Sequence, residues 1–214
     1  MSRPTLLNPE RGDARTRLLE AARDLIRLKG FAATSVDDLC RAAGVTKGAF
    51  FHHFKSKDAL GVAVAEFWTE TTSAFFADAP YHAPEDALQR VLAYVAFRKS
   101  IIEGQIYAFC CVAGTLLQET YESAPAIREA AGASILGHAE TLESDIAIAM
   151  REAGLEHAGF TAASLARHTQ AVLQGAFILA KAGNDPELAR ESLDHLARYI
   201  CTLFARPDLT EPRN

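Results

Sequence analysis

Residues 34–57 read TSVDDLCRAAGVTKGAFFHHFKSK. The hydroxyl pair Thr34 and Ser35 precedes two carboxylates, a pattern typical of a helix N-terminus, where side-chain oxygens cap free N–H groups and negative charge suits the helix dipole. Gly44 can adopt the left-handed conformation that ends a helix, here after about two turns. The pattern then predicts another short helix from near Thr46 to His53.

A longer amphipathic helix is predicted before these two, from Ala14 to Lys29. Its apolar positions recur every three or four residues, and Gly30 offers a residue that can end it. Three helices joined by short, glycine-marked turns have the size and order of a helix-turn-helix domain. The expected core of this domain consists of Leu18, Leu25, Phe31, Val36, Leu39, Phe50 and Phe54.

The outward face of the third helix has the composition of a surface that reads DNA. Small residues let a helix backbone come close to the major groove, where Lys or Thr can meet base edges or phosphates. The residues left for this face and its flanks, once the core is assigned, are Thr46, Lys47, Gly48, Ala49, Phe51, His52 and His53.

Charge is distributed unevenly along the chain. Residues 1–60 contain 11 Lys and Arg against 7 Asp and Glu, whereas residues 61–214 contain 11 against 20, within a net charge of −5. A basic segment suits a polyanion, although solvated basic faces are common in proteins. The asymmetry therefore supports nucleic acid as the partner of the N-terminal part without establishing it.

The remainder of the chain is predicted to be helical, with no convincing alternating strand, so the expected fold class is all-α. Ser56 opens a helix towards Ala77, and Pro80 and Pro84 interrupt the pattern. Further helices are expected at about 85–101, 104–121, 125–153, 160–182 and 186–205.

A compact stop and restart is predicted before the last helix. Gly183 is expected to end one helix, Asp185 to cap the next and Pro186 to be its first residue. The expected domains are a helix-turn-helix domain at 1–60 with its core at 14–57, a helical domain at 61–206 and a polar tail at 207–214.

Length and composition exclude several classes of protein. With 214 residues, of which 49% are hydrophobic, the chain can form one large or two small domains. No apolar run approaches the roughly 18–20 residues that span a bilayer. The N-terminal segment 1–17 is polar, unlike a secretory signal, and four Cys are too few for a disulfide framework. These features predict a soluble protein of the reducing cytoplasm.

Sequence patterns of catalysis and metal binding are missing. The seven His form neither an HExxH motif nor a closely spaced His/Cys cluster. The sequence also lacks the GxSxG nucleophile motif, a Walker loop and a GxGxxG motif after a strand. We therefore expect a protein that is not an enzyme and that has no metal site and no cofactor.

The N-terminal part closely resembles the DNA-binding domain of TetR-family transcriptional regulators. The resemblance covers residues 14–62 and is most distinctive in the runs AGVTKG at 43–48 and FKSK at 54–57. It implies two groups of DNA contacts. Bases or nearby phosphates would meet Thr46, Lys47, Ala49 and His52, and the DNA backbone would be held by Thr34 or Ser35, His53 and Lys57.

Phe51 departs from the family pattern, which often has Tyr at this position and at that of His53. Phenylalanine cannot donate a hydrogen bond to phosphate, so an apolar contact, for instance with a thymine methyl, is expected from it instead. The alternative for His52 and His53 is that they are merely exposed turn residues. The full set of candidate DNA contacts is Thr34, Ser35, Thr46, Lys47, Gly48, Ala49, Phe51, His52, His53 and Lys57.

The rest of the chain is similar to the variable regulatory domain of the same family in length and helicity, most visibly at 109–119 and 173–196. The resemblance implies a small-molecule effector, and helix bundles often hold such molecules between aromatic and a few polar side chains. For each aromatic residue the alternative is an ordinary core position. The candidate ligand residues are Phe67, Trp68, Tyr94, Phe97, Arg98, Tyr107, Cys110, Cys111, Gln118 and His138.

Two apolar stripes near the C-terminus predict a pairing surface. They lie on the helices expected at 160–182 and 186–205, and the alternative is that both faces are buried within one chain. The family resemblance implies a four-helix bundle formed by two copies, whose two-fold symmetry places two recognition helices on one face of DNA. The candidate interface residues are Leu165, Val172, Ala176, Leu179, Leu193, Leu196 and Ile200.

These expectations combine into a homodimeric transcriptional regulator, more precisely a repressor that a small-molecule effector releases from a palindromic operator. One alternative is a thiol-responsive or redox-responsive regulator that uses Cys110 or Cys111, although adjacent cysteines in an apolar helix are more often buried small hydrophobes. Another alternative is a helical ligand-binding module that does not bind DNA. Operator and effector are not identified by the sequence.

Overall fold

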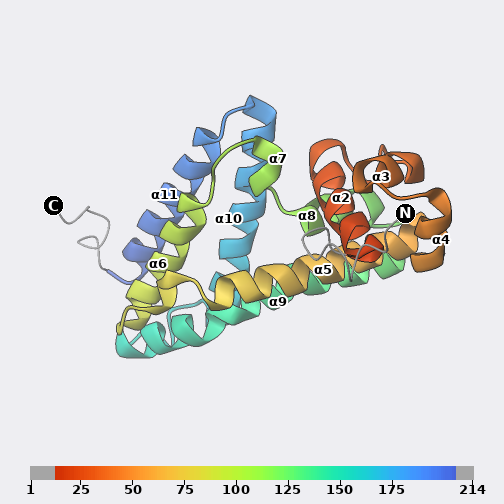
Figure 1. Cartoon of the computed structure of the whole chain (residues 1–214). Coiled ribbons are helices and arrows are strands. Elements are labelled where there is room, and N and C mark those ends of the chain that lie inside the picture. The colour runs from red at the N-terminus through yellow and green to blue at the C-terminus, as the bar shows by residue number, and fades with distance from the viewer. Residues whose placement is uncertain (1–12, 206–214) are drawn as a thin grey trace. The chain divides into compact units, whose positions relative to one another are not determined.

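The computed structural model describes residues 13–205, and every regular element within this range is a helix (Figure 1). The all-α prediction is therefore confirmed. No helix among residues 13–205 is both long and apolar enough to cross a membrane. The elements in chain order are α2 (Ala14–Lys29), α3 (Val36–Ala43), α4 (Lys47–His53), α5 (Lys57–Ala77), the 3-10 helix η2 (Pro80–His82), α6 (Ala87–Ser100), α7 (Ile106–Phe109), α8 (Val112–Thr120), α9 (Pro125–Glu152), α10 (Ala162–Gly183) and α11 (Glu187–Leu203).

The chain divides into two compact units. Unit 1 contains the described residues up to Ser73 together with Cys111–Ser134, and unit 2 contains Ala74–Cys110 and the described residues from Ile135 onward. α5 and α9 contribute to both units because their ranges cross a border between them. The predicted functional border between residues 60 and 61 stays a prediction, and the predicted tail at 207–214 lies outside the described residues.

The helices α2, α3 and α4 begin at side-chain caps. Asp13 accepts a main-chain hydrogen bond of 2.7 Å at the start of α2, and the Thr46 hydroxyl oxygen accepts one of 3.1 Å at the start of α4. At the start of α3, Ser35 and Asp38 form a reciprocal capping box. Each cap stabilises its helix by about 1 kcal/mol. Gly44 ends α3 with a left-handed φ of 63°, as predicted.

An apolar core joins α2, α3 and α4 in unit 1. Phe50 is completely buried, and this fixes which side of α4 faces inward. Of the predicted core, Leu25 and Val36 are half-buried. The buried members are Leu18, Phe31, Leu39, Phe50 and Phe54.

The single helix predicted at 104–121 is wrong. The structure has two helices there, α7 and α8, and the residues between them, Cys110 and Cys111, have extended backbones with ψ values of 151° and 120°. The physical reason is local: the Cys111 sulfur accepts a hydrogen bond of 3.4 Å from the Gly114 N–H and so acts as the N-cap of α8. Apolar periodicity does not register such a cap, because it continues through both helices.

The stop and restart before α11 is shifted from the predicted residues. Asn184, and not Gly183, has the left-handed conformation, with φ of 50°, which asparagine tolerates better than most residues. Gly183 is the last residue of α10, where an added Cβ would lie 2.3 Å from Leu188. Pro186 serves as the N-cap position of α11, and the Asp185 carboxylate accepts from the Glu187 N–H at 2.9 Å.

The helices of unit 2 are joined by apolar packing and, among the described residues, by two ion pairs between different helices. α10 packs against α11 through buried side chains that include Leu173 and Leu193. Arg90 on α6 pairs with Asp145 on α9 at 2.7 Å, and the hydrogen bonds between them hold the guanidinium in its charged form by raising the pKa of Arg90. A second pair joins α6 to α11 and is described below with the groove that it borders.

Candidate nucleic-acid interface and ligand site

The side of α4 opposite Phe50 is open to solvent. It carries a large apolar side chain, Phe51, which is 51% exposed and packs edge-to-face on Phe50 at 5.2 Å between ring centroids. Thr46 uses its oxygen lone pair for the cap, so its hydroxyl hydrogen can still donate. Of the sequence-predicted contacts on this helix, the exposed ones are Thr46, Lys47, Gly48, Phe51 and His52, and the half-buried ones are Ala49 and His53.

Lys47 pairs with a carboxylate of the preceding helix. Its ammonium lies 3.0 Å from Asp37, and the two side chains are 59% and 65% exposed. An ion pair this exposed contributes only about 0–1 kcal/mol. The ammonium can therefore exchange its partner for a phosphate at little cost.

Asp38, the second carboxylate of α3, is hydrogen-bonded within unit 1. Asp38 accepts hydrogen bonds from Lys29 at 2.8 Å and from the Ser35 main chain and hydroxyl at 3.2 and 2.8 Å. The bond from Lys29, followed by those from Ser35, holds the pKa of Asp38 well below its usual range. Asp38 is therefore ionised and committed to the fold of unit 1.

No atom among residues 13–205 lies close enough to Gly48 to require a glycine there. A Cβ built at this residue would meet only the Thr46 hydroxyl oxygen, at 3.8 Å, which is an ordinary contact. Glycine inside a helix lowers stability by roughly 0.5–1 kcal/mol relative to alanine. The absence of a side chain at this exposed position fits the close approach of an external surface.

Two residues predicted to hold DNA backbone have bonds inside unit 1. Thr34 is 1% exposed, and its hydroxyl donates to the Gly30 carbonyl at 2.6 Å. The Lys57 ammonium donates to the carbonyls of Phe31 and Thr34 at 2.9 and 3.1 Å. The exposed Ser35 is thus the more accessible of the Thr34–Ser35 pair, and the DNA roles of all three residues stay predictions.

Glu119 on α8 holds the turn between α2 and α3 and was missed by sequence reasoning. Its carboxylate accepts a hydrogen bond of 2.8 Å from the Ala32 N–H. The carboxylate also fills the space beside Gly30, where φ is +91° and a Cβ would lie 2.3 Å from its oxygen. No local pattern predicts a contact between residues 87 positions apart.

Part of the predicted ligand set meets in unit 2. Tyr94, Phe97, Arg98 and His138 belong to one aromatic and polar cluster. The other members of this cluster, which are absent from the predicted ligand set, are Phe76, Tyr81, Gln170 and Phe177. The remaining candidates are not in this cluster: Phe67, Trp68, Cys111 and Gln118 belong to unit 1, and Tyr107 and Cys110 lie at α7 and its end.

The buried Tyr94 hydroxyl is the centre of the cluster's hydrogen bonds. Its oxygen accepts from Arg98 Nη1 and from Gln170 Nε2, both at 3.0 Å. With both lone pairs used, its own hydrogen donates to His138 Nε2 at 2.8 Å, so that nitrogen carries no proton. Burial, and then the charge of Arg98, lower the pKa of His138 to about 4, in agreement with a neutral imidazole.

Tyr81 is a second buried phenol of the cluster. Its ring lies edge-to-face on Tyr94, with centroids 5.2 Å apart. Burial is the main cause that raises the pKa of Tyr81 to about 12. Tyr81 therefore stays a neutral phenol at physiological pH.

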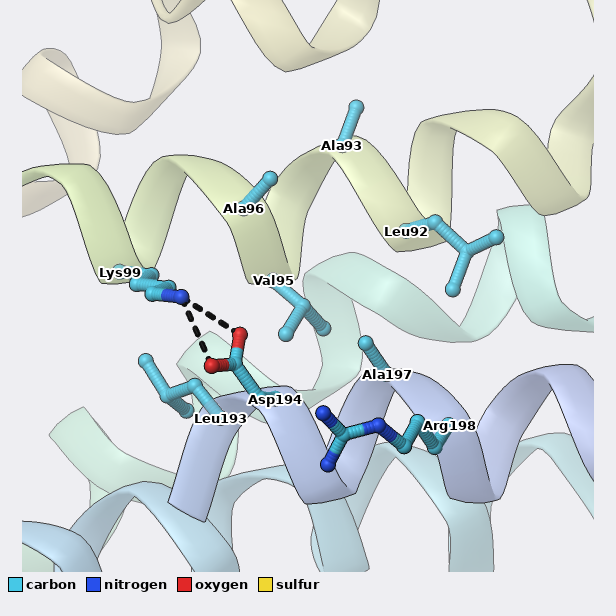
Figure 2. Close-up of a pocket in the computed structure, with 9 residues that line it drawn as sticks. All are labelled: Leu92, Ala93, Val95, Ala96, Lys99, Leu193, Asp194, Ala197 and Arg198. Atoms are coloured by element: carbon cyan, nitrogen blue, oxygen red, sulfur yellow. Dashed lines mark hydrogen bonds and ion pairs between the residues drawn. The ribbon is translucent and has the colours of Figure 1, made fainter. Parts of the chain in front are cut away.

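An open groove of about 430 Å³ lies elsewhere in unit 2, between α6 and α11 (Figure 2). Figure 2 shows Lys99 on α6 pointing at Asp194 on α11, and their nitrogen and oxygen atoms lie 2.6 and 2.8 Å apart. Alanine side chains form much of the remaining lining. None of the predicted ligand residues lines this groove.

Cysteines and metal-binding groups add no further site to the described part of the chain. All four cysteines lie within residues 13–205 and none forms a disulfide there; Cys111 is half-exposed and the other three are buried. Within residues 13–205 no group of three or more His, Cys, Asp or Glu side chains could hold a metal ion.

Most of the predicted pairing surface is packed inside the protomer. Leu179 is 52% exposed and Val172 is half-buried, whereas the other five residues have the buried positions that the sequence left open as the alternative. These five are Leu165, Ala176, Leu193, Leu196 and Ile200. The large apolar side chains that α10 and α11 expose are Ile178, Leu179 and Tyr199.

The N-terminal domain matches a known family. Residues 18–64 fit the family model described as bacterial regulatory proteins, tetR family. Over 54 residues the chain is 41% identical to the HTH-type transcriptional repressor NemR of Escherichia coli K12, a match to 25% of this chain and 27% of that protein. It is 38% identical over 56 residues to an uncharacterised HTH-type regulator, YerO of Bacillus subtilis 168, which covers 26% of this chain and 19% of the relative.

Solved structures match over most of the chain, whereas the curated relatives match over about a quarter of it. A TetR transcriptional regulator from Chloroflexus aurantiacus superposes with a TM-score of 0.76 at 24% identity, covering 90% of this chain and 96% of the other. The reduced form of Escherichia coli NemR superposes with a TM-score of 0.70 at 24% identity, covering 86% of this chain and 95% of the other. These relatives are regulators and not enzymes. Residues 18–64 thus form a domain of the tetR family of bacterial regulatory proteins, and the chain has the fold of TetR-family transcriptional regulators.

Proposed function

We propose that this protein is a cytoplasmic, homodimeric transcriptional repressor that a small-molecule effector releases from a palindromic DNA operator. The observation that carries the proposal is the exposed side of α4, where Thr46, Lys47 and His52 surround a glycine while Phe50 anchors the opposite side. A helix with a polar, glycine-containing outer side fits the major groove. The basic balance of residues 1–60 supports the same partner.

Each group on α4 has a distinct part in the proposed complex. The Thr46 hydroxyl donates to a base edge or phosphate, and the Lys47 ammonium leaves Asp37 for a phosphate oxygen. Phe51 makes an apolar contact with a thymine methyl. In a two-fold dimer the two copies of α4 reach half-sites about 34 Å apart, one turn of DNA.

The test is a selection from random duplex DNA with purified full-length protein, followed by affinity measurements on the enriched duplex. We expect a palindrome bound by the wild type and bound at least tenfold more weakly by Lys47→Ala. Lys181→Ala removes the same charge from an exposed position on α10 and should bind like the wild type. No enrichment by a folded protein at low salt contradicts DNA binding and favours a ligand-binding module.

Asp37→Asn tests the ion pair of Lys47. The substitution frees the ammonium and removes a negative charge from the proposed DNA side, so DNA affinity should rise severalfold. Asp78→Asn, at an exposed position in unit 2, removes the same charge and should leave affinity unchanged. Equal affinities of Asp37→Asn and wild-type protein would contradict the assignment of Lys47 to a phosphate.

Release by an effector follows from a difference in affinity between two conformations. An effector that binds the DNA-incompetent conformation more tightly by about 1.4 kcal/mol lowers DNA affinity tenfold. Within unit 1 the candidate element for this change is α8, because Glu119 on this helix bonds to the α2–α3 turn of the proposed DNA-binding domain.

A second candidate is a regulator that responds to thiol oxidation at Cys111. The observation in its favour is that Cys111 is half-exposed and caps α8, the helix that carries Glu119. Hydrogen peroxide should then release the wild type and Cys110→Ser from the operator but not Cys111→Ser. Release of Cys111→Ser to the same extent as the wild type excludes this candidate.

A further inference from the structure

No carboxylate among residues 13–205 pairs with Arg98. Among residues 13–205 no ion pair includes its guanidinium, which instead lies over the rings of Phe76, Tyr94 and Phe177 at 5.0, 5.8 and 5.9 Å from their centroids. Aromatic faces attract a cation, but less strongly than an anion does. The positive charge of Arg98 is therefore available to bind an anion.

The polar neighbours of Arg98 are neutral. The Tyr94 hydroxyl donates to His138, the imidazole lacks a proton on Nε2, and Gln170 contributes an amide. The hydrogen bonds of these groups are directed at one another, and only Arg98 Nη1 takes part in their network. The cluster as a whole therefore has a charge of +1 from Arg98 alone.

The side edge of the guanidinium is without partners. Arg98 Nε is buried and has no hydrogen bond, and no described group bonds to Nη2. These two N–H groups point in parallel and match the two oxygens of a carboxylate. The other α6 cations differ, because Arg90 and Lys99 each have their own aspartate at 2.7 and 2.6 Å.

We propose that Arg98 binds the carboxylate of a small aromatic or apolar organic acid, which is the effector of this protein. The Nε and Nη2 groups donate to the two carboxylate oxygens, and the apolar body packs among Phe76, Phe97 and Phe177. The inference rests on the proposed function only in taking unit 2 as the effector-binding part.

Binding at this edge requires a movement of side chains. Because Arg98 Nε is buried in the free protein, an acid reaches it only when the aromatic side chains that cover it are displaced. The acid therefore binds a second arrangement of these side chains in unit 2, and not the one described. Phe76 and Phe177, whose ring centroids lie 5.0 and 5.9 Å from the guanidinium carbon, are the side chains that must move.

The experiment compares acids with their neutral amides. Benzoate, phenylacetate and 2-naphthoate are tested against benzamide, phenylacetamide and 2-naphthamide at millimolar concentration by thermal unfolding, followed by calorimetric titration. A ligand that binds only the folded state raises Tm with its concentration. We expect at least one acid to raise Tm of the wild type while its amide does not, and Arg98→Gln to weaken its binding at least tenfold.

Two further variants control the measurement. Arg151→Gln removes an exposed guanidinium of α9 and should bind the acid like the wild type. If Arg98→Gln does not fold, Arg98→Lys keeps the charge without the parallel N–H pair and should bind at least several times more weakly. The proposal is overturned if no acid raises Tm above its amide, or if the Arg98 variants bind as tightly as the wild type.

These readouts need no DNA, so the failure of this inference is distinguishable from failure of the proposed function. If acids bind through Arg98 but no operator is enriched, the acid-binding site is supported and the proposed repressor function is contradicted. If an operator is bound through α4 but no acid binds, the proposed repressor function is supported and the acid-binding site is contradicted.

Discussion

Gly48 is the residue at which the stability of the free protein and the affinity of the proposed DNA complex should respond in opposite directions to one substitution. Nothing in the described part of the chain requires a glycine there, so Gly48→Ala should raise the free energy of unfolding by about 0.5–1 kcal/mol. The added methyl group separates α4 from the groove, and DNA affinity should fall. Chemical denaturation and operator binding measure the two effects.

Gly137 on α9 offers the matched control, since an added Cβ meets nothing within 4 Å. Gly137→Ala should gain a similar stability and keep its DNA affinity. If Gly48→Ala also keeps its DNA affinity, the backbone of α4 does not approach DNA at that residue.

His138 makes folding stability depend on pH. Its pKa falls from 6.5 in the unfolded chain to about 4 in the folded one, chiefly through burial. Between these values the unfolded chain binds the proton and the folded chain does not, so stability is full above pH 6.5 and decreases as the pH falls towards 4. The loss amounts to at most about 3 kcal/mol.

Denaturation at several pH values measures this dependence. His138→Gln keeps an acceptor for the Tyr94 hydroxyl and removes the proton site, so the decrease between pH 6.5 and 4 should be smaller. His157→Gln, at an exposed position, should follow the wild type. An unchanged decrease in His138→Gln would contradict the neutral imidazole.

At the scale of elements, the turn between α2 and α3 depends on two distant side chains. Lys57 on α5 binds its carbonyls, and Glu119 on α8 accepts from its Ala32 N–H. Glu119→Ala leaves that N–H without its acceptor, which costs roughly 1 kcal/mol. It should lower both Tm and operator affinity.

Glu119→Gln and Glu122→Ala distinguish the loss of the hydrogen bond to Ala32 from the loss of a negative charge. The glutamine retains an oxygen for the Ala32 N–H and should restore most of the Tm, whereas Glu122 is exposed and its loss should change neither quantity. Full operator affinity in Glu119→Ala would show that α8 does not position the DNA-binding domain.

Elements whose limits depend on near neighbours were predictable from the sequence. The caps Asp13, Ser35 and Thr46 act within three residues, and so α2, α3 and α4 have their predicted limits. The break at Cys110 and Cys111 was not predictable, because cysteine is an unusual N-cap and the apolar pattern runs through it. Contacts such as that of Glu119 need the tertiary fold.

The candidate sites were also predictable where they depend on residues close in sequence and not where they depend on distant ones. The exposed side of α4 could be predicted once Phe50 was assigned to the core. The cluster around Tyr94 could be predicted only in part, because Gln170 and Phe177 come from α10, more than seventy residues along the chain. The apolar stripes of α10 and α11 could not be assigned from the sequence, because a face buried within one chain and a face that pairs with a second copy have the same apolar pattern.

At the scale of the molecule, pairing of two chains is proposed to use the exposed apolar side chains of α10 and α11. Leu179→Glu places a charge at a position that is 52% exposed, so the protomer should fold and the dimer should dissociate. Sedimentation shows the change in mass. Leu28→Glu, at a position 58% exposed on α2, should stay dimeric, and a dimeric Leu179→Glu would place the interface elsewhere.

The central claim is that α4 reads DNA as one of two copies in a dimer, and a salt-dependent titration of the selected duplex tests it most directly. The prediction is two chains per duplex. The slope of log K against log salt should be about 2 smaller in magnitude for Lys47→Ala than for the wild type, because the dimer loses two phosphate contacts. Equal affinities and equal slopes for the two proteins would contradict the account.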